Sequence, residues 1–366
     1  MTTPSALRFI ASFLVLEALG CSPGAAVPEP SRAPAVESTS EPITDDEAMA
    51  RTASYLDQCA KAWITERWPF VQGGQCALSC HTTAPYLEIR GRLPGHSSIP
   101  TEIRSLVVAR VEQGTEVDPW YPDHEKGSRG VEAVLSAAAL STFDEAGSLS
   151  PETKKALDAL WKFQREDGGF HWWDEFSLVP WESMHSGAWG TAMALYTVAR
   201  VPTSYREGLT PAQERGLQRL GERVLAIVGD SDLPRNHRAL ATVAAARQGI
   251  LPSGSQTALV AELGQAQRDD GSWSALALGF GKGTDCEGHA YATALFGWVL
   301  RELGTQPERV ARAQQWLRGA REPDGRWEAV SLNDPQRSFN NTLMTDAATA
   351  WAVRLLTDEQ TVARPR

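Results

Sequence analysis

An Asp-Gly turn followed by an aromatic residue recurs three times after residue 150, each time at the end of an amphipathic segment. The copies read "KALDALWKFQREDGGF" (155–170), "ALVAELGQAQRDDGSW" (258–273) and "RAQQWLRGAREPDGRW" (312–327). Glycine suits the left-handed conformation that ends many helices, and aspartate before it suits a turn. We therefore expect each copy to form a helix, a tight turn and an aromatic side chain that folds back onto that helix.

A second segment rich in small residues follows each turn. These segments read "HSGAWGTAMALYTVARV" (185–201), "HAYATALFGWVLREL" (289–303) and "TLMTDAATAWAVRLL" (342–356). Alanine, glycine and threonine spread around a helix let its neighbours approach closely, so we expect inner helices that are surrounded on all sides.

The repeat unit spans about fifty residues, with a degenerate copy near "LAIVGDSDLPRNHRALATVAAA". Helical repeats of this length form either an open solenoid or a closed ring. Strand signals are nearly absent, so the sequence predicts an all-α fold.

The turn motifs "QREDGGF", "QRDDGSW" and "REPDGRW" resemble the Gln-Trp repeats of the squalene–hopene cyclase and protein prenyltransferase superfamily. The resemblance covers roughly residues 45–357. It implies one α/α toroid, with its N-terminal helices in 45–145 and its repeats in 146–360, and an apolar or isoprenoid-like ligand. "PWESMHSGAWGTAMALYTV" and "RWEAVSLNDPQRSFNNTLMTDAATAWAVRLL" resemble, more narrowly, exported bacterial proteins that join a cytochrome-c-like Cys-x-x-Cys-His segment to such repeats.

The N-terminus predicts export. Arg8 precedes the apolar run Phe9–Leu16, which is too short to span a bilayer, so residues 1–20 have the pattern of a signal peptide. The ending "ALGC" resembles the lipobox of bacterial lipoproteins, which implies a lipid anchor on Cys21; an ordinary secretory signal is the alternative. Ser22 stands where aspartate marks inner-membrane retention, which favours the outer membrane.

Composition limits the partners. Residues 21–44 are rich in Pro, Ala, Ser and Glu and predict a disordered tether between the lipid anchor and the folded part. The net charge of −10 and the pI near 5.3 argue against nucleic acid. The expected partners are therefore a membrane, through the anchor, and an apolar ligand.

The stretch "CALSCH" has the elements of a c-type haem attachment site. Cys76, Cys80 and His81 match the usual Cys-x-x-Cys-His pattern except for one additional residue between the cysteines. His96 or His124 would then supply the second axial ligand, since the next methionine is more than a hundred residues away.

Disulfides are the alternative to haem, because export exposes thiols to an oxidising compartment. With Cys21 lipidated, two disulfides would use the remaining cysteines, which are Cys59, Cys76, Cys80 and Cys286. A zinc site from cysteines and His81 is disfavoured by the same oxidising conditions.

The superfamily's enzymes suggest one cluster of candidate catalytic residues. The Asp-x-Asp-Asp acid motif of the cyclases is absent from the sequence, and its nearest counterpart is "GTDCEGHAYAT", with Asp285, Glu287 and His289. Prenyltransferases bind zinc through Asp, Cys and a distant His, but the spacing differs here and Asp346 stands in the place of that histidine. The alternative interpretation is a solvated loop without a catalytic role.

Glu182 and His185 form a second candidate pair, at the start of an inner helix. They suit acid–base chemistry, or they only cap the helix. Because inner helices of a toroid begin at one rim, we expect a cluster of Glu182, His185, Asp285, His289 and Asp346 there. The nearby tryptophans line an apolar cavity or fill the core; they are Trp172, Trp173, Trp181 and Trp189.

Two functional hypotheses follow. In the first, an exported lipoprotein binds an apolar ligand in its toroid or transfers electrons through a c-type haem. In the second, an enzyme of the terpene cyclase or prenyltransferase type acts on an isoprenoid or lipid-like substrate. The missing acid motif and the imperfect zinc pattern favour the first hypothesis.

Overall fold

The computed structural model describes residues 44–67, 77–144, 147–173, 185–279, 287–333 and 338–357. Several predictions from the sequence concern other residues and lie outside this part of the chain. They are the signal peptide, the tether, and the residues Cys21, Cys76, Glu182, Asp285 and Cys286.

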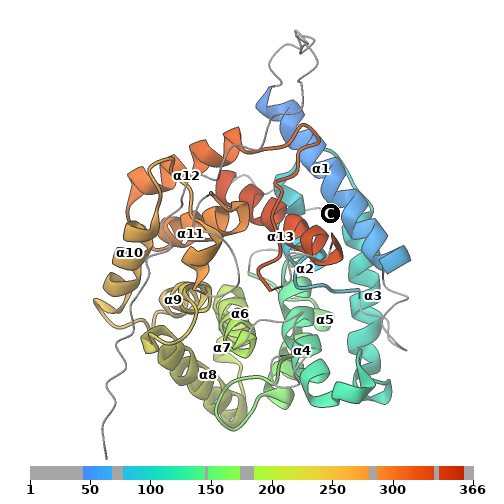
Figure 1. Cartoon of the computed structure of the whole chain (residues 1–366). Helices are drawn as coiled ribbons and strands as arrows, with labels where there is room; N and C mark the ends of the chain where they lie inside the picture. Colours follow the sequence, from blue (N-terminus) through green and yellow to red (C-terminus); the bar gives the residue numbers. More distant parts are fainter. Residues whose placement is uncertain are drawn as a thin grey trace, which may run out of the picture. The chain divides into compact units, whose positions relative to one another are not determined.

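Helices rich in small residues form a closed inner ring in the described part of the chain (Figure 1). Each of them packs against the next, and the last packs against the first. In ring order they are α2 (Thr83–Ile89), α4 (Glu125–Ser141), α6 (Ser186–Arg200), α9 (Arg235–Gln248), α11 (Ala290–Glu302) and α13 (Ser338–Leu356).

An outer helix precedes each inner helix along the chain and packs against the inner ring. The outer helices are α1 (Asp45–Ala62), α3 (Ile99–Gln113), α5 (Pro151–Phe163), α8 (Pro211–Gly229), α10 (Ser255–Ala266) and α12 (Pro307–Gly319). The short helix α7 (Thr203–Glu207) joins α6 to α8, and the described residues contain no β-strand. The fold is an all-α toroid of helical hairpins, as the sequence predicts.

The turn glutamines tie neighbouring outer helices together. Gln164 Nε2 donates to the carbonyl of Gly168 in its own turn, at 3.0 Å, and to that of Gly216 on α8, at 2.9 Å. Gln267 Nε2 donates to the carbonyl of Gly271 in its own turn, at 2.9 Å, and to that of Arg309 on α12, at 3.0 Å. Each turn therefore fixes the position of the outer helix that follows it in the ring.

The turn aromatics fold back onto the helix just ended, as predicted. Trp273 Nε1 donates to the carbonyl of Leu263 at 2.8 Å, and Trp327 Nε1 donates to that of Leu317 at 2.7 Å. Both indoles are fully buried. Each tryptophan thus satisfies a carbonyl near the end of its helix while filling the space between the outer and inner helices.

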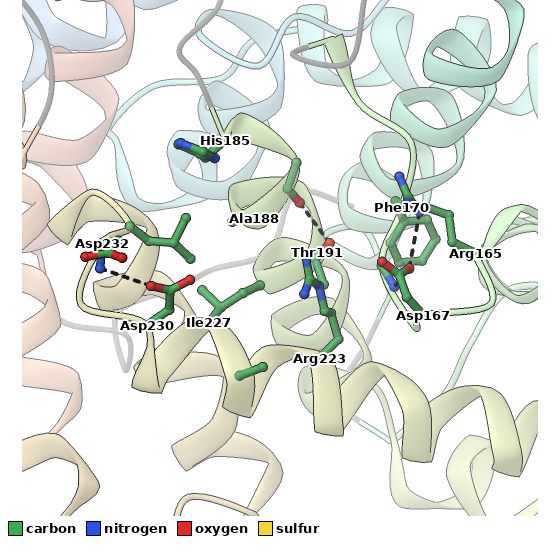
Figure 2. Close-up of a pocket in the computed structure, with 14 residues that line it drawn as sticks. Arg165, Asp167, Phe170, His185, Ala188, Thr191, Arg223, Ile227, Asp230 and Asp232 are labelled. Carbon is green, nitrogen blue, oxygen red and sulfur yellow. Dashed lines mark hydrogen bonds and ion pairs between the residues drawn. The ribbon is translucent and has the colours of Figure 1, made fainter. Parts of the chain in front are cut away.

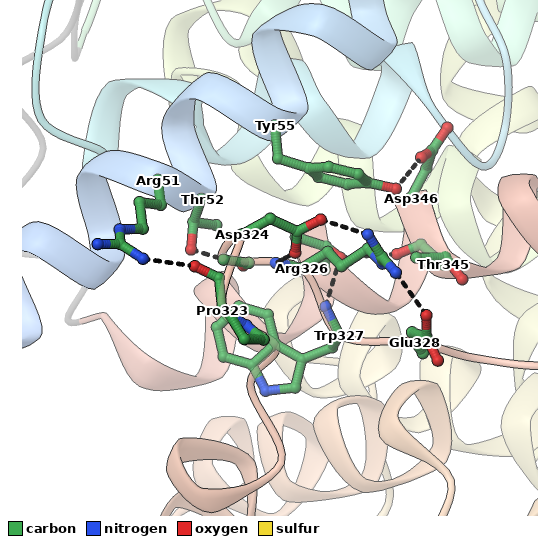
Figure 3. Close-up of polar contacts among 12 residues, drawn as sticks. Arg51, Thr52, Tyr55, Pro323, Asp324, Arg326, Trp327, Glu328, Thr345 and Asp346 are labelled. Carbon is green, nitrogen blue, oxygen red and sulfur yellow. Dashed lines mark hydrogen bonds and ion pairs between the residues drawn. The ribbon is translucent and has the colours of Figure 1, made fainter. Parts of the chain in front are cut away.

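The third turn closes the ring, because the helix that it meets is α1 (Figure 3). Thr52 Oγ1 donates to the carbonyl of Gly325 at 2.7 Å, and Arg51 Nη1 donates to that of Pro323 at 2.8 Å. Arg321 forms an ion pair with Asp45 at 3.3 Å. The first and last outer helices are therefore joined by the same kind of turn that joins the others.

Gly325→Ala is expected to destabilise the ring closure by about 2–4 kcal/mol. Gly325 has φ +92°, and a Cβ on it would lie 2.3 Å from the backbone nitrogen of Thr52, which cannot move without shifting α1. Urea unfolding measures the effect. Gly319→Ala is the matched control, because a Cβ there has nothing within 4 Å; equal losses in the two variants would contradict this account of the closure.

Candidate functional site

The inner ring encloses an aromatic lumen made of two adjoining cavities. The larger, about 150 Å³, lies at the N-terminal ends of the inner helices, and we call it the lumen mouth. The smaller, about 40 Å³, is lined by alanines and aliphatic and aromatic side chains together with the ion-paired Glu88 and Arg354, and we call it the lumen floor. Cys80, Trp189 and Trp351 line both cavities, so the two form one continuous site.

Aromatic rings in edge-to-face contact form one wall of the lumen. Trp351 on α13 is the centre of this wall: its ring centroid lies 5.1 Å from that of Trp298, 6.2 Å from Trp189 and 6.4 Å from Tyr291. Tyr196 extends the wall beyond Trp298, at 5.8 Å. Such contacts each contribute about 0.5–1.5 kcal/mol beyond burial, so the wall is rigid as well as apolar.

An ion pair lies beside the lumen floor. The guanidinium of Arg354 lies over the rings of Trp298 and Trp351, at 4.3 and 4.7 Å from their centroids. Its Nη1 lies 2.8 Å from the carboxylate of Glu88, which also pairs with Arg200 at 3.5 Å. The charge of Arg354 is therefore already compensated by a carboxylate and by aromatic faces.

Two neutral imidazoles line the lumen mouth. Burial lowers the pKa of His81 to about 4. Burial, together with the nearby His185, lowers the pKa of His237 to about 3. At neutral pH both side chains are therefore uncharged, and each can donate one hydrogen bond and accept another.

The two histidines belong to a wider pattern that the sequence analysis missed. Of the chain's 7 histidines, five lie within two residues of the start of an inner helix. They are His81, His124, His185, His237 and His289. The positive end of a helix dipole favours neutral imidazole there. The signal in the sequence is a histidine directly before a segment rich in small residues.

His185 faces a different cavity from the lumen mouth. It has a left-handed backbone, φ 70°, and lines a space of about 300 Å³ between α6 and α8 (Figure 2). Arg165, Arg223 and Asp230 line the same space. Its predicted partner Glu182 lies outside the described residues.

Glu287 and His289 line a third cavity, of about 930 Å³, together with Tyr55. His289 caps its own helix: Nδ1 accepts from the backbone nitrogen of Ala292 at 3.4 Å, and Nε2 lies 3.0 Å from the carbonyl oxygen of Val330. Burial lowers the pKa of His289. These contacts give the imidazole a structural role at the start of α11.

Asp346 lies between helices and lines none of these cavities. It is 0% exposed, and its carboxylate accepts from Tyr55 Oη at 2.9 Å and from Thr82 Oγ1 at 2.8 Å. These bonds tie α13 to α1 and to the turn that carries His81. His185 therefore faces another cavity than His289, and Asp346 is connected to the His289 cavity only through its hydrogen bond with Tyr55.

An extended segment, residues 327–333, separates the lumen mouth from the third cavity; we call it the strap. Side chains one turn apart on α13 hold it: Thr349 accepts from the Trp327 backbone nitrogen at 3.0 Å, and Thr345 accepts from that of Ala329 at 3.1 Å. Because helix residues four apart share one face, α13 presents a regular row of acceptors. This row explains why the strap runs straight across the rim.

The haem attachment pattern lies only partly in the described residues. Its Cys80 and His81 border the lumen mouth. The partner thiol of the attachment pattern, Cys76, lies outside the described residues. The haem site therefore stays a prediction from the sequence.

The described part of the chain contains no group of three His, Cys, Asp or Glu side chains arranged to hold a metal ion. None of its helices combines the length and the apolar character needed to cross a membrane.

No protein-family model and no curated protein matches the chain. Among solved structures, the type II terpene cyclase MstE from Scytonema without ligand is similar over 83% of this chain and 98% of that one, with 16% identity and a TM-score of 0.49. A variant of MstE bound to its substrate, geranylgeranyl dihydroxybenzoate, is similar over 84% of this chain and 98% of that one, with 15% identity and a TM-score of 0.48. A variant bound to the product merosterolic acid A is similar over 84% of this chain and 97% of that one, with 15% identity and a TM-score of 0.47.

Proposed function

We propose that the lumen binds a small apolar ligand, of the size and character of one or two isoprene units. The observation that carries the proposal is the lumen mouth: a concave space of about 150 Å³ with Trp172, Trp189, Tyr291 and Trp351 in its lining. Apolar cavities of this volume bind benzene-sized molecules. Concave sites walled by aromatic side chains with a few polar groups are typical ligand sites.

An enzymatic role on such a ligand is the second candidate. Its support is that His81, His237 and Cys80 line the same cavity as the aromatic wall. A neutral imidazole is suited to accept a proton from a bound ligand. Protonating an alkene, in contrast, requires a strong acid, and Glu88, the carboxyl group in the described lining of the lumen, lies at the floor and is paired with Arg354. Binding therefore fits the described residues better than cyclisation does.

Leu343→Trp is expected to weaken the binding of ten-carbon isoprenoids at least tenfold. Leu343 lines the mouth and is only half-buried, so a larger side chain there enters the cavity without displacing the core. Calorimetric titration with geraniol and with the hydrocarbon myrcene measures the affinity. Leu106→Trp is the control, because Leu106 is 39% exposed on the outer helix α3.

Two outcomes would count against the lumen site. If neither isoprenoid binds the unaltered protein, the proposed function is wrong. If both bind and the two variants lose affinity equally, the ligand binds somewhere other than the lumen. Incubation with geraniol followed by analysis of products separates binding from turnover.

Export, the lipid anchor on Cys21 and the c-type haem are further proposals that rest on the sequence alone. Mass spectrometry of the mature N-terminus tests the anchor. An absorption spectrum in alkaline pyridine, taken on protein made with haem c maturation, tests the haem.

A further inference from the structure

The lumen mouth contains polar atoms without a partner, all on one wall. Ser186, the first residue of α6, is 3% exposed, and Asn236, the second residue of α9, is 4% exposed. Both line the mouth, yet Ser186 Oγ and Asn236 Oδ1 have no hydrogen-bond partner among the described residues. An unsatisfied buried polar group costs about 1–3 kcal/mol. Two such groups on adjacent, packed helices therefore point to a ligand that satisfies both.

The chemistry of these atoms selects the ligand group. A serine hydroxyl can donate, whereas an amide oxygen only accepts. A ligand hydroxyl is complementary to both, since it accepts from Ser186 Oγ and donates to Asn236 Oδ1. A carbonyl oxygen would satisfy only the serine. A protonated amine could donate to both oxygens, but it would leave the serine proton without an acceptor.

The charges around the mouth exclude an ionised ligand group. No Asp, Glu, Lys or Arg is among the described residues that line it. The cation nearest to the lumen, Arg354, is already paired with Glu88 beside the floor. An anion in the mouth would face the positive ends of α6 and α9 but would be buried without a counter-ion, and a cation would be repelled by the same helix ends.

We infer that the ligand of the lumen is an uncharged alcohol whose hydroxyl group lies between Ser186 and Asn236 and whose apolar body lies against the Trp189–Trp351 wall. This inference rests on the proposed function, because it names the class of ligand for the same cavity. It distinguishes a small terpenoid alcohol from an isoprenoid acid, amine or diphosphate.

The test is a calorimetric titration of the full chain at pH 7 with a matched series on one carbon skeleton. The series is geraniol, geranic acid, geranylamine, geranyl diphosphate and the hydrocarbon myrcene. Geraniol is expected to bind at least tenfold more tightly than each of the others. Tighter binding of the acid, the amine or the diphosphate would overturn the inference while leaving the lumen site in place. Equal binding of all five would do the same.

Variants assign the hydroxyl contact to its residues. Ser186→Ala removes one atom and is expected to weaken geraniol about tenfold while leaving myrcene unchanged; Asn236→Leu is expected to have the same selective effect. Ser255→Ala, at the start of the outer helix α10, is the control. Equal losses for geraniol and myrcene in both lumen variants would show that these side chains shape the cavity without contacting a hydroxyl. Failure of every ligand to bind the unaltered protein would defeat the proposed function itself.

Discussion

Replacing Arg354 by methionine is expected to lower the free energy of unfolding by about 3–5 kcal/mol, the range found when one partner of a buried ion pair is removed. Arg354 is 6% exposed, and its guanidinium lies 2.8 Å from Glu88. Methionine fills most of the volume of the lost side chain, so the loss reports the charge of Glu88, which then keeps only its longer contact with Arg200, at 3.5 Å. Urea unfolding at neutral pH measures it.

Adding Glu88→Gln to Arg354→Met removes both charges of this ion pair. Removing both charges is expected to recover more than half of the stability lost by Arg354→Met, because no uncompensated charge then stays in the core. Arg326→Met is the control: this arginine also has two carboxylate partners, but it lies on the surface, where such pairs contribute about 0–1 kcal/mol. A loss at Arg354 no larger than that at Arg326 would show that the pair beside the lumen floor does not stabilise the ring.

Acidification from pH 7 to pH 5 is expected to destabilise the fold through the lumen histidines. Burial holds the pKa of His81 near 4 and that of His237 near 3, below the ordinary value of 6.5. Between pH 6.5 and these values the unfolded chain binds protons that the folded chain does not. The stability is therefore full above pH 6.5 and falls below it, by roughly 2 kcal/mol per histidine at pH 5.

Thermal unfolding across this pH range tests the linkage. His237→Gln removes one of the buried histidines and is expected to reduce the dependence of stability on pH by about 2 kcal/mol between pH 7 and pH 5, whatever its effect at pH 7. His96→Gln, at an exposed position, is the control and is expected to leave the dependence unchanged. If His237→Gln and the unaltered protein follow parallel curves, protonation of His237 does not limit the stability.

The sequence was sufficient for the repeating part of the fold. Asp-Gly turns and small-residue helices are local signals, and α5, α6, α10, α11, α12 and α13 follow them closely. The role of Thr52 and Arg51 in closing the ring was not predictable, because no local pattern says that the third turn meets a helix more than 270 residues away.

The candidate site was less predictable than the fold. Asp346 has the residue type and the position of a catalytic carboxylate, but its partners Tyr55 and Thr82 come from distant parts of the chain and bury it. Trp172 and Trp189 line the lumen, which agrees with one of the two interpretations of the sequence, while Trp173 packs against Tyr121. The spare hydrogen-bonding capacity of Asn236 follows only from packing.

The contact between the third turn and α1 completes the ring, so the lumen forms only after this contact has been made. The hydrogen bond from Arg51 to Pro323 spans 272 residues of sequence, so an N-terminal fragment of any length short of the third turn is an open arc. In such an arc Trp189 has no Trp351 to cover it, and its face is available to other chains. Topologies that depend on such distant contacts fold slowly and expose apolar surface in the meantime. During synthesis, therefore, the vulnerable interval lasts until the final hairpin has emerged, and the shielding of the aromatic wall is the last event of folding.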